Sequence, residues 1–322
     1  MAPTTEETHA LLAEIPNLTV KTGVPLSQHT RFGIGGPADL FAEAEDAEAF
    51  AAALAVAHGA GIPVMVIGGG TNLIVSDEGF RGLVLRFRGE EITAEGERLT
   101  AQAGAVLQDV VDFSITRGLK GLETLAGIPG SFGAAVYGNA GAYGRSISEL
   151  VVSVLFFDGS GLRSFNNEEC RFRYRESAFK QRKGWTILSA DLVLQLADPA
   201  GLRKMADEIL QVRNAKFPVT MKCAGSIFKN LLYADLPESV AAGIPPTNVR
   251  EGKVPAAWFL EQAGARGLSR GGMHVADYHA NLIYNSGEGK AADLRDMITD
   301  LKCRVRERFG IELEEEVQYV GF

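Results

Sequence analysis

The chain has 322 residues, 46% of them hydrophobic, which is enough for a substantial core and for two or three domains. Its formal charge of −8 and pI near 5.3, with no run of basic residues, disfavour nucleic-acid binding. No signal-peptide pattern and no apolar stretch of about 18 residues is present, so we expect a cytoplasmic protein without membrane contact.

The first 80 residues predict a small α/β arrangement. We expect a helix over 6–15, a strand over 39–42, an alanine-rich helix over 46–59 that Gly59 or Gly61 ends, and a buried strand over 62–67. A glycine knot, Gly68-Gly69-Gly70-Thr71-Asn72, follows this strand. Because another strand-like run, 73–76, comes next instead of a helix, the dinucleotide-binding fingerprint of a Rossmann domain is excluded.

The remaining periodic segments alternate between strands and helices. Short β-prone pieces lie between 82 and 105, and a helix over 107–117 ends at Gly118. Further strands are expected over 147–157, 185–196, 281–285 and 312–320, helices over 202–213, 256–263 and 291–309, and loops over 236–254 and 264–279. The three cysteines are far apart and lack CxxC spacing, so neither a disulfide framework nor a metal site is expected.

The stretch 121–144 carries glycines every few residues and hardly any charge. Its backbone can adopt positive φ and allows another molecule to approach closely. Together with the knot at 68–72 it indicates a site for one large anionic cofactor. Arg31, between glycines in the segment 28–38, is a candidate for phosphate contact, with a surface salt bridge as the alternative.

Seven short blocks follow one another along the chain: the segments 30–38, 68–72, Gly127-Ile128-Pro129-Gly130-Ser131, Asn139-Ala140-Gly141-Ala142-Tyr143-Gly144, Tyr174-Arg175-Glu176-Ser177, Ala224-Gly225-Ser226-Ile227-Phe228-Lys229-Asn230 and Glu314-Glu315-Glu316-Val317. Together and in this order, they resemble the UDP-N-acetylenolpyruvoylglucosamine reductase family, from about Thr30 to the C-terminus. Only about fifty residues separate Arg175 from Ser226, which matches the shorter, second type of the family.

This resemblance implies an α+β fold: a two-subdomain FAD-binding fold of the vanillyl-alcohol-oxidase type plus a smaller α+β substrate-binding domain. The implied boundaries are 1–84 for the first FAD-binding subdomain, 85–215 with 311–322 for the second, and 216–310 for the substrate domain. The implied activity is NADPH-dependent reduction of UDP-N-acetylglucosamine enolpyruvate to UDP-N-acetylmuramate through non-covalent FAD, in peptidoglycan synthesis. A monomer is expected.

Three residues match the needs of that reaction, which adds a hydride to one enolpyruvyl carbon and a proton to its neighbour. By resemblance Arg175 faces the substrate carboxylate and the developing enolate, Ser226 delivers the proton, and Glu316 donates a hydrogen bond to the enol system if it is protonated. The residues alone favour a surface arginine for Arg175, in the run 171–175, and a serine that caps a turn or helix for Ser226; the resemblance reverses both preferences. Glu316 is chosen over Glu314 and Glu315 because it immediately precedes Val317, as in the family's tail.

The resemblance also implies the binding residues. FAD would be held by Arg31, Gly68, Gly69, Gly70, Thr71, Asn72, Gly127, Ile128, Pro129, Gly130, Ser131, Gly133, Ala134, Asn139 and Gly141, and the UDP-sugar by Tyr143, Lys216, Asn230 and Gln262. Lys216 is the strongest of the second set because a diphosphate favours a cation, although a solvated lysine is the alternative.

Three positions depart from the family pattern. Gln318 stands where the family has arginine, Leu231 where it has proline, and Gly138 where it has a larger residue. The alternative functions are a flavin-dependent alcohol oxidase of the same cofactor fold and a non-catalytic binder of nucleotide-sugars. Alcohol oxidases often tether FAD through a histidine, and the glycine loops contain none.

Overall fold

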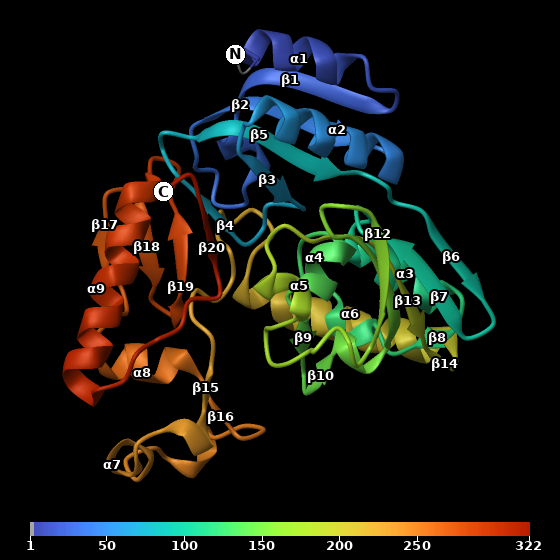
Figure 1. Ribbon diagram of the computed structural model, residues 1–322. Helices are drawn as coiled ribbons and strands as arrows, with labels where there is room; N and C mark the ends of the chain where they lie inside the picture. The colour runs from blue at the N-terminus through green and yellow to red at the C-terminus, as the bar shows by residue number, and fades with distance from the viewer. Residues whose placement is uncertain (1–2) are drawn as a thin grey trace. The chain divides into compact units, whose positions relative to one another are not determined.

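The computed structural model describes residues 3–322, which form two compact units (Figure 1). Unit 1 contains the residues up to Val24, Ala38–Gly70 and Arg81–Val219, and unit 2 contains Pro25–Pro37, Thr71–Phe80 and Thr220–Phe322. The division into three parts expected from the sequence stays a prediction. The two units are described separately below.

Unit 1 begins with a four-stranded sheet and two helices. The sheet has the order β1-β2-β5-β3, and β3 runs parallel to β5. Helix α2 is capped by Asp46, which accepts the Ala49 N–H, and it ends at Gly61 with a left-handed φ of 68°. The expected strand–helix–strand unit is therefore confirmed. The element bounds are α1 Thr5–Ala13, β1 Leu18–Pro25, β2 Pro37–Ala44, α2 Ala47–Ala60, β3 Val64–Ile67 and β5 Phe80–Phe87.

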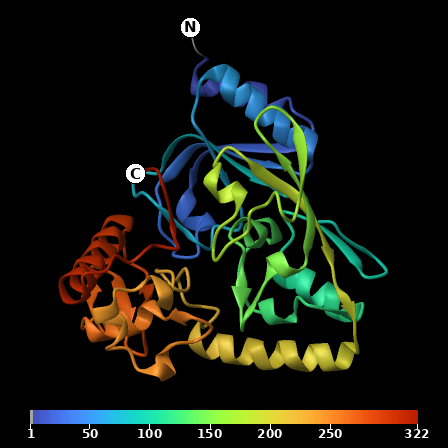
Figure 2. The ribbon, with the colours of Figure 1, turned by 60° about the horizontal axis from the view of Figure 1, so that its bottom comes forward.

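The rest of unit 1 is an antiparallel five-stranded sheet, β12-β11-β13-β7-β6, with helices packed against it. Helix α6 is the long yellow helix of Figure 2. The bounds are β6 Ile92–Glu95, β7 Arg98–Gln102, α3 Leu107–Thr116, β8 Leu119–Lys120, α4 Phe132–Tyr137, β9 Gly141–Ala142, β10 Arg145–Ser146, β11 Val151–Phe157, β12 Leu162–Asn166, α5 Ala178–Gln181, β13 Thr186–Val193, β14 Gln195–Leu196 and α6 Pro199–Lys216.

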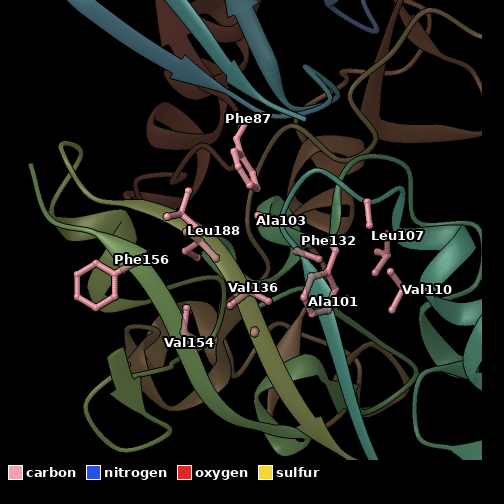
Figure 3. Packing of buried hydrophobic residues seen from close by; sticks show 14 of the residues in the cluster. Phe87, Ala101, Ala103, Leu107, Val110, Phe132, Val136, Val154, Phe156 and Leu188 are labelled. Atoms are coloured by element: carbon pink, nitrogen blue, oxygen red, sulfur yellow. The ribbon is translucent and has the colours of Figure 1, made fainter. Parts of the chain in front are cut away.

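One continuous hydrophobic core holds unit 1 together (Figure 3). Phe132 and Val136 of α4 are fully buried and lie beside Ala101 and Ala103 of the β7 segment. Gly133 lies against the same segment, since a Cβ there would meet the Ala103 Cβ at 2.5 Å. Close packing of α4 on the sheet thus fixes the position of the glycine-rich segment that precedes it.

Unit 2 consists of a three-stranded sheet, β17-β18-β19, helices α8 and α9, and the parallel pair β20 and β4. An excursion between β15 and β16 carries the short helix α7. Helix α9 has the predicted bounds and ends at Gly310, whose φ is 68°. The bounds are β4 Leu73–Val75, β15 Leu231–Leu232, α7 Glu238–Ala241, β16 Lys253–Val254, α8 Ala256–Gln262, β17 Ser269–Arg270, β18 Met273–Ala276, β19 His279–Asn285, α9 Ala291–Phe309 and β20 Gln318–Val320.

Several local predictions were wrong. The stretch 121–144 contains helix α4, because Ser131 caps a run of small and apolar residues. The loop predicted over 264–279 contains β17 and β18. The tail is a strand only at Gln318–Val320, since Asn72 and the segment 227–229 take the hydrogen bonds of the preceding glutamates. Across residues 3–322, no helix is long and apolar enough to cross a membrane.

Candidate active site

The two glycine-rich segments of unit 1 lie against each other. A Cβ on Gly69 would meet the Gly130 Cα at 3.1 Å, and one on Gly68 would meet the Ser131 Oγ at 2.7 Å. Gly127 and Gly130 have φ values of 74° and 117°, which residues with side chains rarely adopt. Glycine is therefore required here by backbone conformation, as the sequence predicted, and also by the close approach of the chain's own second glycine-rich segment.

Side chains hold the 127–134 segment from both ends. Gln108 on α3 accepts the Gly127 N–H at 2.8 Å, and the Ser131 hydroxyl accepts the Ala134 N–H at 3.3 Å. The flanking residues Ile128 and Pro129 complete the turn, and Pro129 is exposed. The segment is thus a fixed turn with part of its backbone at the surface of unit 1.

Arg175 lies beside the Asn139-to-Gly141 turn. Its guanidinium donates to the Gly141 carbonyl at 3.0 Å and to the Asn139 carbonyl at 3.4 Å. The Asn139 side chain in turn donates to the Arg173 carbonyl at 2.8 Å. Arg175 has a left-handed φ of 57°, so its backbone is held in an uncommon conformation.

The structure therefore joins Arg175 to two residues predicted to bind the cofactor. This arrangement does not match a surface arginine, because its side chain is tied to a turn 34 to 36 residues away.

Two of the predicted substrate-binding residues, Tyr143 and Lys216, belong to unit 1, and both are exposed. Tyr143 has a φ of 53° and is 53% exposed. Lys216 is the last residue of α6, and its ammonium lies 5.0 Å from the centre of the Phe217 ring. Both side chains can reach a ligand at the surface of their unit, and no described contact buries either one.

In unit 2, the segment 226–229 runs between β19 and the C-terminal tail. Ser226 forms a bridge with Leu282 of β19, and the Ile227 N–H donates to the Asn281 carbonyl at 3.0 Å. The Asn281 side chain bonds both backbone groups of Phe228, each at 2.9 Å. Ser226 thus lies in an extended segment that is bridged to β19, it caps no helix, and the residue is partly exposed.

Glu316 lies on the other side of this segment. Its N–H donates to the Ile227 carbonyl at 2.7 Å, and its carbonyl accepts from the Asn72 side chain at 2.9 Å. The structure therefore brings Glu316 to the segment 226–229, although Ser226 and Glu316 are ninety residues apart in the chain. Asn72, in the glycine knot, also accepts the Gln318 N–H through its own carbonyl at 3.0 Å.

The remaining predicted residues of unit 2 have different surroundings. The Asn230 side chain accepts the Ala256 N–H at 3.3 Å, at the start of α8, and Gln262 is the exposed last residue of the same helix. Arg31 is partly exposed in the loop whose next residue, Phe32, accepts from Asn285 at 2.9 Å. Thr71 is partly exposed beside Asn72.

Lys229 is a charge that sequence reasoning passed over. Only 7% of this residue is exposed, and its ammonium is ion-paired with Glu314 at 2.5 Å. The signal was a lysine directly after the buried pair Ile227 and Phe228, in a stretch whose apolar residues predict burial. Within residues 3–322, no group of three or more histidine, cysteine or acidic side chains could hold a metal ion.

The donor set of unit 1 fits a flavin dinucleotide. The segments 68–70 and 127–134 contain no acidic residue, and within the described chain the N–H groups of Gly69, Gly70 and Gly130 donate to no other atom. Backbone N–H groups in glycine turns are common ligands of phosphate oxygens. The close contact between Gly69 and Gly130 also brings the backbones of these two residues together.

Comparisons with known proteins agree with this geometry. The sequence profile of an FAD binding domain matches residues 38–163, and that of the C-terminal domain of UDP-N-acetylenolpyruvoylglucosamine reductase matches residues 217–320. The chain is 66% identical to a UDP-N-acetylenolpyruvoylglucosamine reductase of Solibacter usitatus over 96% of this chain and 99% of that protein. It is 36% identical to one of Heliobacterium modesticaldum, over 92% and 89%.

A solved structure is also similar. The crystal structure of the UDP-N-acetylenolpyruvylglucosamine reductase from Thermus caldophilus is 28% identical, covers 94% of this chain and 99% of its own, and has a TM-score of 0.74. The predicted fold class is confirmed, and the relatives do not favour the alternative of an alcohol oxidase. The chain belongs to the UDP-N-acetylenolpyruvoylglucosamine reductase family.

Proposed function

We propose that this chain reduces UDP-N-acetylglucosamine enolpyruvate to UDP-N-acetylmuramate, with bound FAD and with NADPH as reductant. The observation that carries the proposal is the 66% identity along nearly the whole chain to a reductase of that name. The flavin supplies the chemistry of accepting a hydride from NADPH and passing it to the substrate's enolpyruvyl group.

Arg175 stabilises negative charge in this proposal. Hydride addition to the enolpyruvyl carbon distal to the carboxylate places an enolate on the rest of the group. The guanidinium of Arg175 offers paired donors to the carboxylate oxygens of the substrate. Such donors accelerate reactions in which negative charge builds up in the transition state. The bonds to Gly141 and Asn139 hold this side chain in one orientation before substrate arrives, which limits the entropy lost on binding.

Ser226 delivers the proton to the enolate carbon. A serine hydroxyl is a weak acid, but an enolate carbon is a strong base, so transfer is feasible when the two atoms are held together. The pairing of Ser226 with Leu282 fixes the backbone that carries this hydroxyl. Glu316, held to the same segment through Ile227, donates a hydrogen bond to the enol system in its protonated form.

Binding falls to the remaining residues. The backbones of 68–72, 127–134, Asn139 and Gly141 hold FAD with Arg31, while Tyr143, Lys216, Asn230 and Gln262 contact the UDP-sugar. The exposure of Tyr143, Lys216 and Gln262 supports their assignment, since a ligand can reach each side chain. We further propose that the enzyme works in the cytoplasm as a monomer.

Two measurements on the purified protein test the function. We expect a flavin absorption spectrum, and oxidation of NADPH that depends on added UDP-N-acetylglucosamine enolpyruvate. A flavoprotein that oxidises NADPH at the same rate with and without this substrate would overturn the proposal. Size-exclusion chromatography with light scattering checks the monomer.

A further inference from the structure

Three consecutive glutamates create a register problem in the tail of unit 2. Glu314, Glu315 and Glu316 have identical side chains, and the tail beside them is not a regular strand before Gln318. A slip of one residue against the segment 226–229 would place Glu315 where Glu316 now lies. Register in extended segments is well specified only where neighbouring positions differ in their surroundings.

Here the surroundings differ because Glu314 and Glu315 pair with two different lysines. Glu314 pairs with the nearly buried Lys229 at 2.5 Å, and the Lys229 N–H donates to the Glu314 carbonyl at 2.9 Å. Glu315 pairs with Lys302 of α9 at 2.9 Å, with side chains 19% and 29% exposed. The two lysines come from separate elements, so one tail register satisfies both pairs.

Glu315 also has a second polar neighbour. Burial and, after it, a hydrogen bond to the Glu315 carboxylate raise the pKa of Tyr319, so the tyrosine stays protonated and can donate to Glu315. The tail on both sides of Glu316 is thereby attached, through Glu315 and through the Asn72 bonds to Glu316 and Gln318.

We propose that Lys302 and Glu315 are positioning residues: their ion pair, with Lys229–Glu314, sets the register of the tail so that Glu316 and not Glu315 faces the substrate. The inference rests on the proposed function of Glu316. Buried ion pairs contribute little net stability, and fixing register is the best-attested use of such groups. The pair therefore acts on where Glu316 lies more than on whether the protein folds.

The chain offers a matched control. Arg306 and Glu312 form an ion pair between the same helix and the same tail, one helical turn further on, with side chains 55% and 60% exposed. Exposed pairs of this kind contribute little to stability. Removing them should leave the position of Glu316 unchanged.

The test compares the double variant Lys302→Met/Glu315→Gln with Arg306→Met/Glu312→Gln, both as FAD-loaded enzymes. Removing both charges of the Lys302–Glu315 pair, called the inner pair below, avoids leaving one uncompensated charge that is largely buried. We expect the rate of flavin reoxidation by substrate to fall about 10- to 100-fold in the first variant only, as for a displacement of about 1 Å. Flavin reduction by NADPH and the thermal midpoint should stay close to wild type.

The decisive measurement is whether the effect of a Glu316 substitution depends on the Lys302–Glu315 pair. Glu316→Gln should slow reoxidation less in the inner-pair variant than in wild type, since Glu316 is no longer held in place there. Equal loss in both half-reactions, or the same factor for Glu316→Gln in both backgrounds, would overturn the positioning role. If the substrate does not reoxidise the flavin of the wild-type enzyme either, the proposed function itself is wrong, and the positioning role fails with it.

Discussion

The 127–134 turn of unit 1 and the glutamate tail of unit 2 are built by contacts of very different range. Ser131 caps α4 by accepting the N–H of Ala134, three residues on, and the Gly127 N–H donates to Gln108, nineteen residues away. Glu316, by contrast, binds Asn72 across 244 residues. These two contacts of the turn are of shorter range, whereas the tail depends on two distant segments, at Asn72 and 227–229, as well as on helix α9.

The difference lies in what each region contributes. The turn binds through its backbone groups, so its function requires glycine and small residues in the turn itself. The tail supplies one carboxyl group among three identical ones, so its function requires the residues that distinguish these three. Substitutions in the turn should therefore change ligand binding directly, whereas substitutions around the tail should act by moving Glu316.

The largest effect is expected at Ser226. Ser226→Ala keeps the backbone bridge to Leu282 but removes the hydroxyl, so only proton delivery is lost. Flavin reoxidation by substrate should slow about 10²- to 10⁴-fold, the range for a general acid, while reduction by NADPH continues. Rapid-mixing absorbance of the flavin separates the two steps. Ser286→Ala, which removes a hydroxyl bonded to Gly272 in the same unit, is the control; equal loss in both half-reactions would contradict the role.

Arg175 comes next. Arg175→Lys keeps the positive charge but loses the forked donors that now bond Gly141 and Asn139. We expect reoxidation by substrate to slow about 10²-fold, comparable to removing one donor that stabilises an oxyanion. Arg171→Lys, an exposed arginine of the same basic run, should be close to wild type in the same assay. Similar behaviour of the two variants would return Arg175 to the role of a surface arginine.

Gly69 tests whether close backbone approach is the function of the turn. In Gly69→Ala, the new Cβ would lie 3.1 Å from the Gly130 Cα and force the two segments apart. Such overpacking costs about 1 to 3 kcal/mol, so we expect FAD to dissociate about 5- to 140-fold more readily, as measured by flavin fluorescence during dilution.

The matched control is Gly59 in α2, where a Cβ meets no atom within 4 Å. Gly59→Ala should leave FAD affinity unchanged and stabilise the helix by about 0.5 to 1 kcal/mol. Unchanged FAD affinity in Gly69→Ala would contradict the assignment of this turn to the cofactor.

The sequence alone predicted those regions whose structure depends on contacts between residues near each other in the chain. Helix α9 and its end at Gly310, the cap of α2 at Gly61, and the positive φ of the glycines at 127 and 130 follow from local spacing and residue type. Helix α4 was missed because its six residues, 132–137, lie in a glycine-rich stretch whose composition indicates a loop. The buried Ala101 and Ala103 that hold it come from another strand.

The candidate site was predictable only in part. The motifs indicated Ser226 and Glu316, but their attachment through Ile227 and Asn72 joins segments that no local pattern connects. Nothing in the order of the three glutamates shows that Lys302 binds Glu315 while Lys229 binds Glu314. Long-range pairing is fixed by the folded backbone, and this is the part that sequence reasoning lacked.

The smallest effects are expected at two helix caps, one formed by a residue near the helix in the chain and one by a distant residue. Asp46 caps α2 from three residues away, accepting the Ala49 N–H at 2.7 Å. Asp77 caps α9 from 214 residues away, accepting the Ala291 N–H at 2.9 Å and the Ala292 N–H at 3.0 Å. Asp46→Ala should cost about 1 kcal/mol and raise amide exchange only in α2, as expected for loss of a local cap.

Asp77→Ala should raise amide exchange in two separate places, the first turn of α9 and the neighbouring β4, because the Asp77 side chain joins them.

The stabilisation of α2 by Asp46 should also depend on pH. The Ala49 N–H and, after it, Asn17 lower the pKa of Asp46 below 3.8, so its stabilisation is complete above that value. It is lost as the pH falls through the lowered pKa, and the difference from Asp46→Ala should disappear there. Exchange confined to α9 in Asp77→Ala would show that the distant cap acts as locally as the near one, and the contrast between the two regions would fail.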